Sequence, residues 1–282
     1  DYLQKAIGYS LTGSTEEQVM FILYGNGRNG KSVFMDTLKH VAGSYAKSMS
    51  AKSIMIKQSD SAANSDIARL KGARLVTASE PNEGVRLDEG LVKELTGGDM
   101  VTARFLYGSE FEYKPEFKLW LATNHKPIIR GTDDGIWRRL MLIPFNVQIP
   151  ENKVDKRLAY KLERESVGIL NWAVDGALKW QREGLKAPAS VQAASKSYRA
   201  EMDTLELFVR DCCDLGPDYQ APAGELFKAY QSWAESNGEY KMRKQKFGAE
   251  MKQKFRSKKN NSIFYVGLKI KSDPRLNWAQ RE

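Results

Sequence analysis

The sequence predicts an α/β core with a central parallel sheet, followed by a small α+β module. Continuous apolar runs of strand length, at residues 19–24, 73–79 and 117–123, alternate with segments whose apolar residues recur at helical spacing. Beyond residue 204, two amphipathic helix patterns precede a strongly basic turn and further strand patterns. Buried strands that alternate with helices are typical of a parallel sheet covered by helices.

Composition bounds the class of protein. The 282 residues, 41% of them hydrophobic, are enough for one large domain or two unequal ones. No run approaches a membrane span and no secretory signal precedes the first motif, so we expect a cytoplasmic protein. Because the chain starts at Asp1, we expect a fragment of a longer protein. We predict that the adjacent Cys212 and Cys213 are core thiols, and that His40 and His125 are too few for a histidine-based metal centre.

Positive charge is concentrated in one segment. Residues 240–271 hold eleven lysines and arginines and a single acid, Glu250, whereas the net charge of the whole chain is +9. The rest of the chain is therefore close to neutral. A basic segment attached to a near-neutral body indicates a polyanionic partner.

The first strand pattern leads into a glycine-rich loop. The loop fits G-x-x-x-x-G-K-[ST] and consists of Gly25, Asn26, Gly27, Arg28, Asn29, Gly30, Lys31 and Ser32. A helix pattern follows at residues 33–42. Strand, glycine loop and helix form a phosphate cradle, in which Lys31 would reach the β- and γ-phosphates and Ser32 would bind Mg²⁺. The alternative, a glycine turn with a solvated lysine, does not explain this context.

Other elements are predicted from periodicity and from breaks at glycine and proline. Residues 1–18 favour a helix that ends at Thr12-Gly13-Ser14, and residues 88–96 favour another. The remaining predictions are a short strand at 54–56, helices at 61–71, 151–183 and 189–202, hairpin strands at 100–107 and 110–113, a strand at 140–145, and strands at 262–267 and 268–271.

Two polar residues follow buried strands. Glu80 ends the strand at 73–79, where a P-loop enzyme places a second acidic group that holds Mg²⁺ through water and polarises the attacking water. Asn124 follows the strand at 117–123 and can sense a γ-phosphate and orient water. A strand-end carboxylate and a turn-forming asparagine remain the simpler alternatives.

Basic and aromatic groups occupy two further elements. The expected hairpin carries Arg104, Phe105 and Tyr107, which suit single-stranded nucleic acid but also ordinary cross-strand packing. Arg138 and Arg139 precede a strand, either as a surface pair or as a finger that reaches the γ-phosphate of a neighbouring subunit.

The last segment is predicted to form a small separate module. Leu226, Tyr230 and Trp233 share one helix face, and a second helix presents another apolar face. Helices followed by a basic hairpin fit a winged helix, with residues 243–256 as recognition helix and 257–265 as wing. A basic, solvated helical lid is the alternative. The lysines expected to contact DNA are Lys244, Lys246, Lys252, Lys254, Lys258 and Lys259.

The order of these parts resembles the superfamily 3 helicases. The stretches that carry the likeness are GNGRNGKS, ARLVTASE, LVKELTGGDMVTARFLYGSEFEYKPEFKLWLATNHKP and GIWRRLMLIPF, and they span about residues 1–150. The likeness is strongest to the primase-helicases of phages, plasmids and poxviruses, in their C-terminal helicase portion. The tail looks, more loosely, like the winged-helix end found in that group.

The resemblance implies an AAA+-like core in a ring, usually a hexamer, that uses ATP to move 3′-to-5′ along single-stranded DNA. By motif, Lys31 and Ser32 belong to Walker A, Glu80 is the Walker B carboxylate and Asn124 the sensor. Arg139, with Arg138 as second choice, is the arginine finger. The resemblance also implies forked duplex DNA as a substrate and a primase domain upstream in the full-length chain.

The expected layout is a helical lead-in at 1–18, an ATPase core at 19–150, its helical part at 151–203 and a winged-helix-like module at 204–282.

The sequence departs from the family in two places. Ser79 stands where many members have a second acid before Glu80, and the hairpin tip lacks the lysine or histidine of viral members. Two other functions remain open: an origin-binding initiator whose ATPase controls assembly, and an ATPase that moves protein rather than DNA.

Overall fold

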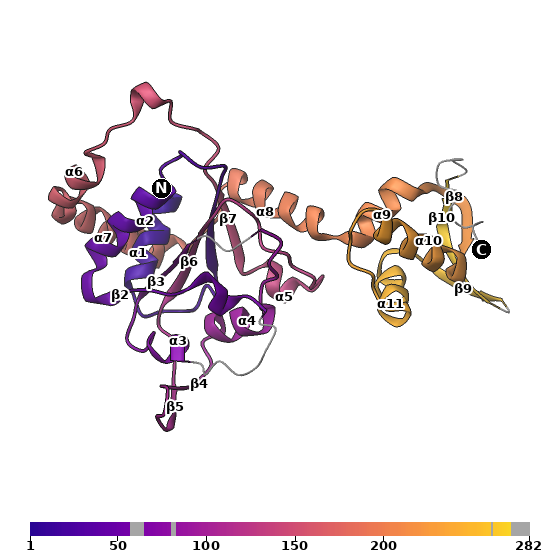
Figure 1. Cartoon of the computed structure of the whole chain (residues 1–282), viewed down its shortest axis with the longest axis horizontal. Coiled ribbons are helices and arrows are strands. Elements are labelled where there is room, and N and C mark those ends of the chain that lie inside the picture. Colours follow the sequence, from indigo (N-terminus) through magenta and orange to yellow (C-terminus); the bar gives the residue numbers. More distant parts are fainter. Residues whose placement is uncertain (57–64, 80–82, 261, 272–282) are drawn as a thin grey trace. The chain divides into compact units, whose positions relative to one another are not determined.

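The computed structural model describes residues 1–56, 65–79, 83–260 and 262–271. The chain divides into two compact units, Asp1–Arg199 and Ala200–Glu282, each with its own buried core (Figure 1). The boundary predicted from the sequence lies four residues later, at residue 204. Among the described residues, no helix combines the length and apolarity that crossing a membrane requires.

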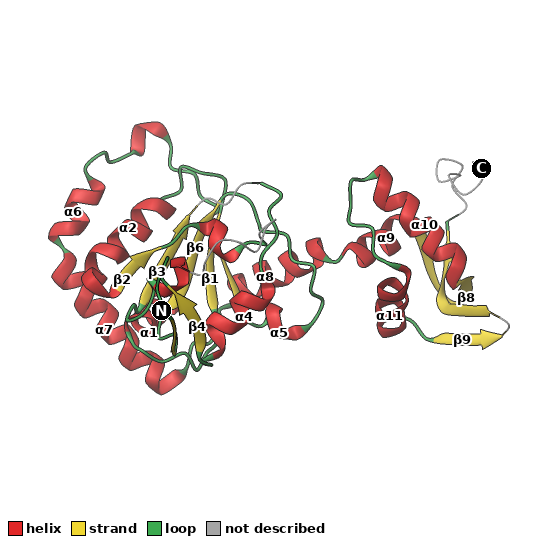
Figure 2. Ribbon diagram, turned by 60° about the horizontal axis from the view of Figure 1, so that its bottom comes forward, coloured by secondary structure: helices red, strands yellow, loops and turns green. Residues whose placement is uncertain are grey.

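A five-stranded sheet in which all neighbours are parallel forms the centre of the first unit (Figure 2). Its strand order is β2-β3-β6-β1-β7. Successive residues of β1 are buried on both faces, which explains why the sequence shows a continuous apolar run there. This sheet confirms the predicted α/β class with a central parallel sheet. The strands are β1 (Met20–Tyr24), β2 (Ala46–Ser48), β3 (Leu75–Ser79), β6 (Lys118–Thr123) and β7 (Leu140–Pro144).

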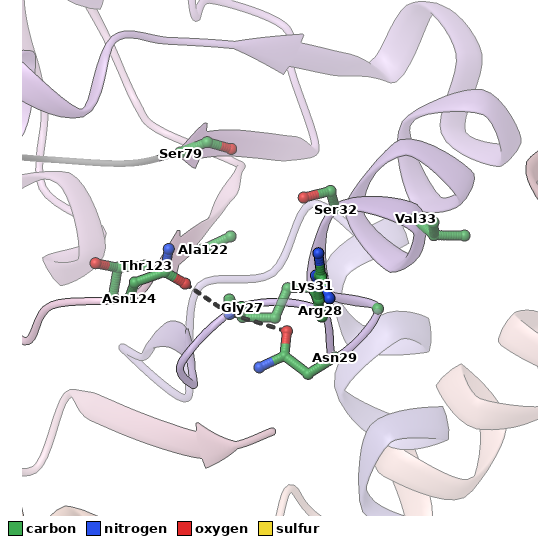
Figure 3. A pocket seen from close by; sticks show the side chains of 11 residues that line it. Gly27, Arg28, Asn29, Lys31, Ser32, Val33, Ser79, Ala122, Thr123 and Asn124 are labelled. Carbon is green, nitrogen blue, oxygen red and sulfur yellow. Dashed lines mark hydrogen bonds between the residues drawn. The ribbon is translucent and has the colours of Figure 1, made fainter. Parts of the chain in front are cut away.

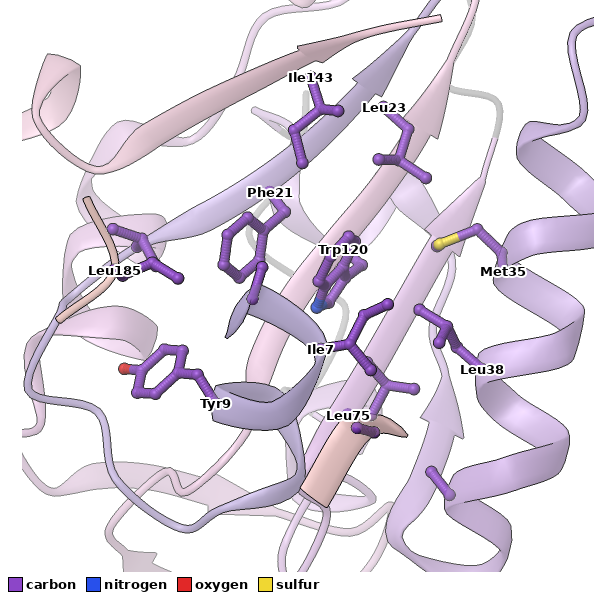
Figure 4. Packing of buried hydrophobic residues seen from close by; sticks show 14 of the residues in the cluster. Ile7, Tyr9, Phe21, Leu23, Met35, Leu38, Leu75, Trp120, Ile143 and Leu185 are labelled. Carbon is purple, nitrogen blue, oxygen red and sulfur yellow. The ribbon is translucent and has the colours of Figure 1, made fainter. Parts of the chain in front are cut away.

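One face of the sheet is covered by three helices that share a core with it (Figure 4). Phe21 and Trp120 are register partners on β1 and β6, and their rings stack with centroids 4.3 Å apart. The Trp120 indole N–H donates to Ser10 Oγ (2.9 Å), which ties the sheet to the first helix. The covering helices are α1 (Tyr2–Leu11), α2 (Lys31–Ala42) and α7 (Ser166–Glu183).

Helices α1 and α7 touch backbone to backbone at two glycines. A Cβ atom at Gly8 would lie 2.1 Å from the amide nitrogen of Ala177. A Cβ atom at Gly176 would lie 2.0 Å from the carbonyl oxygen of Gln4. Neither distance is compatible with a side chain, so this crossing requires glycine on both helices.

The end of the sheet where β6 begins holds a buried lysine. Lys118 Nζ donates to the carbonyl oxygens of Thr12, Ser14 (3.1 Å) and Glu116 (3.1 Å). Burial, aided by the positive charge of Arg74, lowers the pKa of Lys118 to about 7. Lys118 thereby joins the chain after α1 to the central strand.

Among the described residues, five further helices, of 4 to 14 residues, lie between Ser65 and Met202, and one hairpin stands apart from the main sheet. Strands β4 (Val101–Arg104) and β5 (Glu110–Tyr113) pair antiparallel and form that hairpin, which projects from the unit in Figure 1. The helices are α3 (Ser65–Ala68), α4 (Glu89–Gly97), α5 (Asp134–Trp137), α6 (Leu158–Arg164) and α8 (Ala189–Met202), with 3-10 turns at Gly43–Tyr45, Ala51–Ile54 and Glu151–Lys153.

The second unit packs three helices with a three-stranded antiparallel sheet of order β8-β10-β9. Leu226, Tyr230 and Trp233 are buried in its core, as their spacing predicts. Cys212 and Cys213 are also buried and free, and burial raises their pKa values to about 11 and about 12. The elements are α9 (Thr204–Cys212), β8 (Cys213–Pro222), α10 (Ala223–Ser236), α11 (Lys244–Lys254), β9 (Ser257–Asn260) and β10 (Ser262–Ile270).

Several predicted elements are wrong in detail. Ile54 ends a 3-10 turn instead of starting a strand, and the edge strand lies earlier, at β2. The helix predicted at 151–183 is divided into a 3-10 turn, α6 and α7. The two strands predicted at 262–271 are one strand, β10, whose pairing with β8 changes register at Gly267 (φ 100°), where residues 216–219 of β8 bulge opposite this single residue. Part of the helix predicted at 61–71 lies outside the described residues.

Candidate functional site

The glycine-rich loop connects β1 to α2, as its motif predicts. Gly27 and Gly30 have positive φ angles of 87° and 85°, and Arg28 shares this region at 50°. No atom lies within 4 Å of the position that a Cβ would take at either glycine, so these residues are needed for their backbone conformation. Gly30 caps α2 without a side-chain hydrogen bond. The helix therefore presents first-turn N–H groups and the positive end of its dipole to the space in front of the loop.

Lys31 is buried at the centre of a hydrogen-bond network (Figure 3). Its ammonium group donates to the carbonyl oxygen of Gly25 (2.6 Å) and to the side-chain oxygens of Asn29 (3.0 Å) and Asn124 (3.0 Å). Asn29 in turn donates to the carbonyl oxygen of Phe145 (2.9 Å). The structure thus brings together Lys31 and Asn124, which are far apart in the sequence, because β1 and β6 are parallel neighbours.

A cavity of about 250 Å³ opens beside this network. Ser32 and Ser79 line it from α2 and from the end of β3 (Figure 3). Glu80, the predicted second acid, follows Ser79 directly but lies outside the described residues. The other lining residues are Gly27, Arg28, Asn29, Gly30, Lys31, Val33, Ala122, Thr123 and Asn124.

The donor set of this cavity fits a phosphate chain. An ammonium group, the N–H groups at a helix start and a serine hydroxyl are hydrogen-bond donors of the kind that bind phosphate oxygens. Among the described residues there is no group of three His, Cys, Asp or Glu side chains that can hold a metal ion. Mg²⁺ is usually bound by one or two protein groups together with substrate phosphates; of its two predicted ligands, Ser32 lines this cavity and Glu80 lies outside the described residues.

The chain that leaves β7 returns to the loop. Phe145 N–H donates to the carbonyl oxygen of Tyr24 (2.7 Å), and Ile149 N–H donates to that of Arg28 (2.7 Å). These bonds hold residues 145–149 beside the loop. No sequence motif marks this segment, because its position depends on the β1–β7 pairing.

The arginine pair lies at the opposite end of the sheet from the loop. Met20 pairs with Leu140 and Tyr24 with Pro144, so Arg138 and Arg139 adjoin the start of β1 whereas the loop follows its end. One strand length, roughly 16 Å at 3.3 Å per residue, separates the two ends. Neither arginine can therefore reach the loop of its own chain.

The two arginines differ in burial. Arg139 is only 8% exposed and donates to the carbonyl oxygen of Gly135 and to Gln18 Oε1. Arg138 is exposed and also donates to Gln18 Oε1. Gln18, which the sequence did not single out, orients both guanidinium groups. Arg138, the second choice of the sequence, is the one whose side chain is accessible.

The hairpin tip is accessible as well. The first strand ends at Arg104, three residues earlier than predicted, and residues 105–109 form the loop. Tyr107 is 99% exposed with a positive φ of 61°. Phe105 is partly covered because its ring stacks on Phe111 with centroids 5.6 Å apart.

The six predicted lysines of the second unit fall into two groups. Lys254 lies between the carboxylates of Asp203 (2.8 Å) and Glu206 (2.6 Å), which raise its pKa against the effect of burial. Lys246 lies 3.5 Å from Glu250 and over the ring of Tyr240. The other four lysines are exposed: Lys244 and Lys252 on α11 and Lys258 and Lys259 on β9.

The two units match different protein families. Residues 23–139 match a family described as "Family of unknown function (DUF5906)". Residues 200–273 match the family described as "Poxvirus D5 protein-like". This second match coincides with the second compact unit.

Proteins of large DNA viruses are similar to both units together. "Putative helicase L207/L206" of Acanthamoeba polyphaga mimivirus is 32% identical over 229 residues, 75% of this chain and 24% of the relative. "Putative helicase 022R" of Frog virus 3 is 28% identical over 81% of this chain and 25% of the relative. "Putative primase C962R" of African swine fever virus (isolate Warthog/Namibia/Wart80/1980) is 26% identical over 84% of this chain and 26% of the relative. The chain spans about a quarter of the length of these relatives.

Solved structures share the fold. The apo A form of the NrS-1 C-terminal region is similar with a TM-score of 0.55 at 16% identity, over 84% of this chain and 52% of that one. A second structure of that region, residues 305–718, gives a TM-score of 0.51 at 14% identity, over 90% of this chain and 67% of that one. At this identity, the likeness concerns the fold alone.

Proposed function

Because the chain belongs to the primase-helicase group, in which it corresponds to the helicase portion, we propose that it is an ATP-driven DNA helicase or translocase. The observation that carries the proposal is the contact of Lys31 with Asn124 in front of an uncapped helix start. In this proposal the first unit is an AAA+-like core, and several copies form a ring, expected to be a hexamer. Single-stranded DNA and forked duplex DNA are its substrates.

Each polar group of the loop has a role in this proposal. Lys31 and the N–H groups of the loop bind the β- and γ-phosphates, and Ser32 holds Mg²⁺. Mg²⁺ supplies positive charge that neutralises the charge developing on the phosphoryl oxygens. The ammonium group of Lys31 has three protons and already donates to three acceptors, so it must give up one of these hydrogen bonds to bind a phosphate oxygen. If the bond to Asn124 is the one given up, the Asn124 amide becomes available to orient the attacking water beside Glu80.

The arginine pair completes the site of a neighbouring copy. Arg138 and Arg139 are separated from their own loop by the length of the sheet. A head-to-tail ring brings this end of one copy to the loop of the next. Arg138 is the accessible finger, and Arg139 supports it through their shared acceptor, Gln18. Such fingers contribute about 10³- to 10⁵-fold to hydrolysis in other NTPases.

Two surfaces contact DNA in this proposal. Tyr107, with Arg104 and Phe105, projects on the hairpin and can stack on an unpaired base. The second unit acts as a winged helix with α11 as recognition helix and β9 with the start of β10 as wing. Their exposed lysines also favour a second candidate, an origin-binding initiator that binds duplex DNA without unwinding it. Displacement of a strand from a forked duplex distinguishes the helicase from the initiator.

A subunit-mixing experiment tests the shared site. Lys31→Ala and Arg138→Ala chains are co-expressed with different tags, and complexes that contain both are purified. Each variant alone should have less than about 1% of wild-type DNA-stimulated ATP hydrolysis. Mixed complexes should recover up to about a quarter of it, because random head-to-tail assembly pairs an intact loop with an intact arginine in that fraction of interfaces.

The control is a mixture of Lys31→Ala with the Lys31→Ala/Arg138→Ala double variant, in which no interface is intact. That mixture should stay inactive. Failure of the first mixture to recover, or wild-type turnover by Arg138→Ala alone, would exclude a shared site. Full activity of Lys31→Ala would exclude the loop as the site of hydrolysis.

A further inference from the structure

The side-chain amide of Gln18 connects the arginine pair to the end of α4. Its oxygen, Oε1, accepts from Arg138 Nη2 and, at 3.3 Å, from Arg139 Nη2. Its nitrogen, Nε2, donates to the carbonyl oxygen of Gly97 (2.8 Å). An amide oxygen has two lone pairs, and here both are used. One planar group therefore joins two segments that are far apart in the sequence.

The end of α4 is held by the chain that precedes β1. Gly97 is the last residue of α4, and the last carbonyl groups of a helix have no partner within the helix. Gln18 supplies a donor to one of them. Gly98 follows with a φ of 86°, and a Cβ atom there would lie 3.1 Å from Thr15 Oγ1. Residues 15–18 thus lie against two successive residues at the end of this helix.

The end of α4 leads directly into the projecting hairpin. Only residues 98–100 separate Gly97 from Val101, where β4 begins. Val101 is fully buried, so the first strand of the hairpin is anchored at its start. Helix α4 and the hairpin lie toward the same end of the first unit in Figure 1. The position of the helix end therefore determines where the hairpin begins.

The backbone of Gln18 adopts a conformation that is uncommon for a residue with a side chain. Its φ is 52°, in the left-handed region, which costs free energy unless the surrounding structure imposes it. Its N–H donates to the carbonyl oxygen of Thr15 (3.0 Å) and closes a tight turn. This turn places the amide between the arginines and the end of α4.

We propose that Gln18 is a positioning residue that couples the nucleotide of the neighbouring copy to the DNA hairpin of its own chain. The inference rests on the proposed function, in which Arg138 reaches the γ-phosphate held by the next copy. When Arg138 moves to that phosphate, Gln18 Oε1 loses or follows one of its donors. Because the amide is planar, its nitrogen moves with its oxygen, and the contact with Gly97 changes as well.

The start and the middle of α4 are attached in other ways. Glu89 Oε1 accepts from the N–H groups of Arg130 (2.9 Å) and Gly131 (3.1 Å). Lys93 Nζ donates to both carboxylate oxygens of Asp133 (2.9 and 3.1 Å). These contacts join α4 to the chain that precedes α5. They offer a comparison for the contact at the helix end.

The affinity for single-stranded DNA, measured with and without a non-hydrolysable ATP analogue and Mg²⁺, gives a ratio that reports the coupling. Fluorescence anisotropy of a labelled oligonucleotide measures both affinities. In the wild type they should differ by a factor of about 5 or more, the lower end of coupling between sites. A purely structural role would change both affinities together and leave their ratio as it is.

Gln18→Glu is the decisive variant. Its carboxylate still accepts from both arginines but cannot donate to the carbonyl oxygen of Gly97. The two affinities should then agree within about twofold. Arg138→Ala should have the same effect, because the signal starts at that arginine. Lys93→Met is the matched control: it removes a contact of the same helix and should keep the wild-type ratio. Thermal melting checks that all variants fold.

A wild-type ratio in Gln18→Glu would overturn the inference, since Gln18 would then only orient the arginines. A wild-type ratio in Arg138→Ala would overturn it too, as would an equal loss in Lys93→Met. Equal affinities in a wild type that binds both ligands would overturn the coupling and leave the proposed function in place. A wild type that binds neither the analogue nor DNA would overturn the proposed function itself.

Discussion

The phosphate loop and the basic face of the second unit use charge in different ways. At the loop, one buried ammonium group contacts three acceptors, two in the loop itself and one directly after β6. On α11 and β9, lysines such as Lys252 and Lys258 stand exposed on the surface. The first arrangement depends on the position of individual atoms, whereas the second depends on summed charge. A single substitution at the loop should therefore abolish ATP hydrolysis. A single substitution on the basic face should only weaken DNA binding.

The substitution Asn124→Ala should show the largest effect of those that compare the two regions. We expect DNA-stimulated ATP hydrolysis to fall about 100-fold while ATP affinity changes little, because the amide positions water rather than the nucleotide. Turnover and calorimetric binding measured on the same preparation would check this. His125→Ala is the control, since His125 is adjacent and exposed. A decrease in ATP affinity equal to the decrease in turnover would contradict the sensor role.

The basic face should respond in smaller steps. For Lys244→Ala/Lys252→Ala, we expect the slope of log affinity for DNA against log salt to decrease by about 2, one unit for each phosphate that a lysine no longer neutralises. Fluorescence anisotropy between about 50 and 200 mM salt would measure the slope, roughly the range over which such interactions weaken. An unchanged slope would mean that α11 does not face DNA.

Lys254→Ala provides the matched comparison on the same helix. Asp203 and Glu206 already pair with Lys254, so its removal should leave the salt slope unchanged. It should instead destabilise the second unit by less than about 1 kcal/mol, since the pair is partly solvated and screened. These measurements would show which predicted lysines bind DNA and which hold the fold.

The last expected effect concerns Lys118 and pH. Burial lowers its pKa to about 7 in the folded chain, against 10.5 for the ordinary group. Between these values the unfolded chain binds the proton that the folded chain has released, so folding stability should rise with pH. Relative to Lys118→Met, wild-type stability should rise by up to about 1 kcal/mol per pH unit between about pH 7 and 9. Denaturant unfolding at several pH values would measure it, and a constant difference would mean that Lys118 stays charged.

The sequence predicted elements whose signal is local. The glycine loop, the buried strands beside it and α4 and α8 each follow from a motif, a periodicity or a cap within their own residues. Asn124 was also found, because it directly follows a buried strand. Its contact with Lys31 depends on the strand order, which no local pattern contains.

The features that were missed depend on distant partners. Strand β8 holds several polar residues, and it is a strand because β10 pairs with residues 213–215 and 220–222, on either side of Gly216 and Pro217. The burial of Arg139 depends on Gly135 and Gln18, and residues 149–158 approach the loop only through the β1–β7 pairing. None of these partners is visible from composition or spacing.

The glycine crossing of α1 and α7 bears on how relatives can be recognised. Since each glycine faces the backbone of the other helix, a larger residue at one position cannot be compensated by a smaller one at the other. The two positions should therefore stay glycine together in any protein that packs these helices in the same way. That pair of glycines, rather than the phosphate loop common to many NTPases, is the mark by which this particular arrangement of helices can be traced.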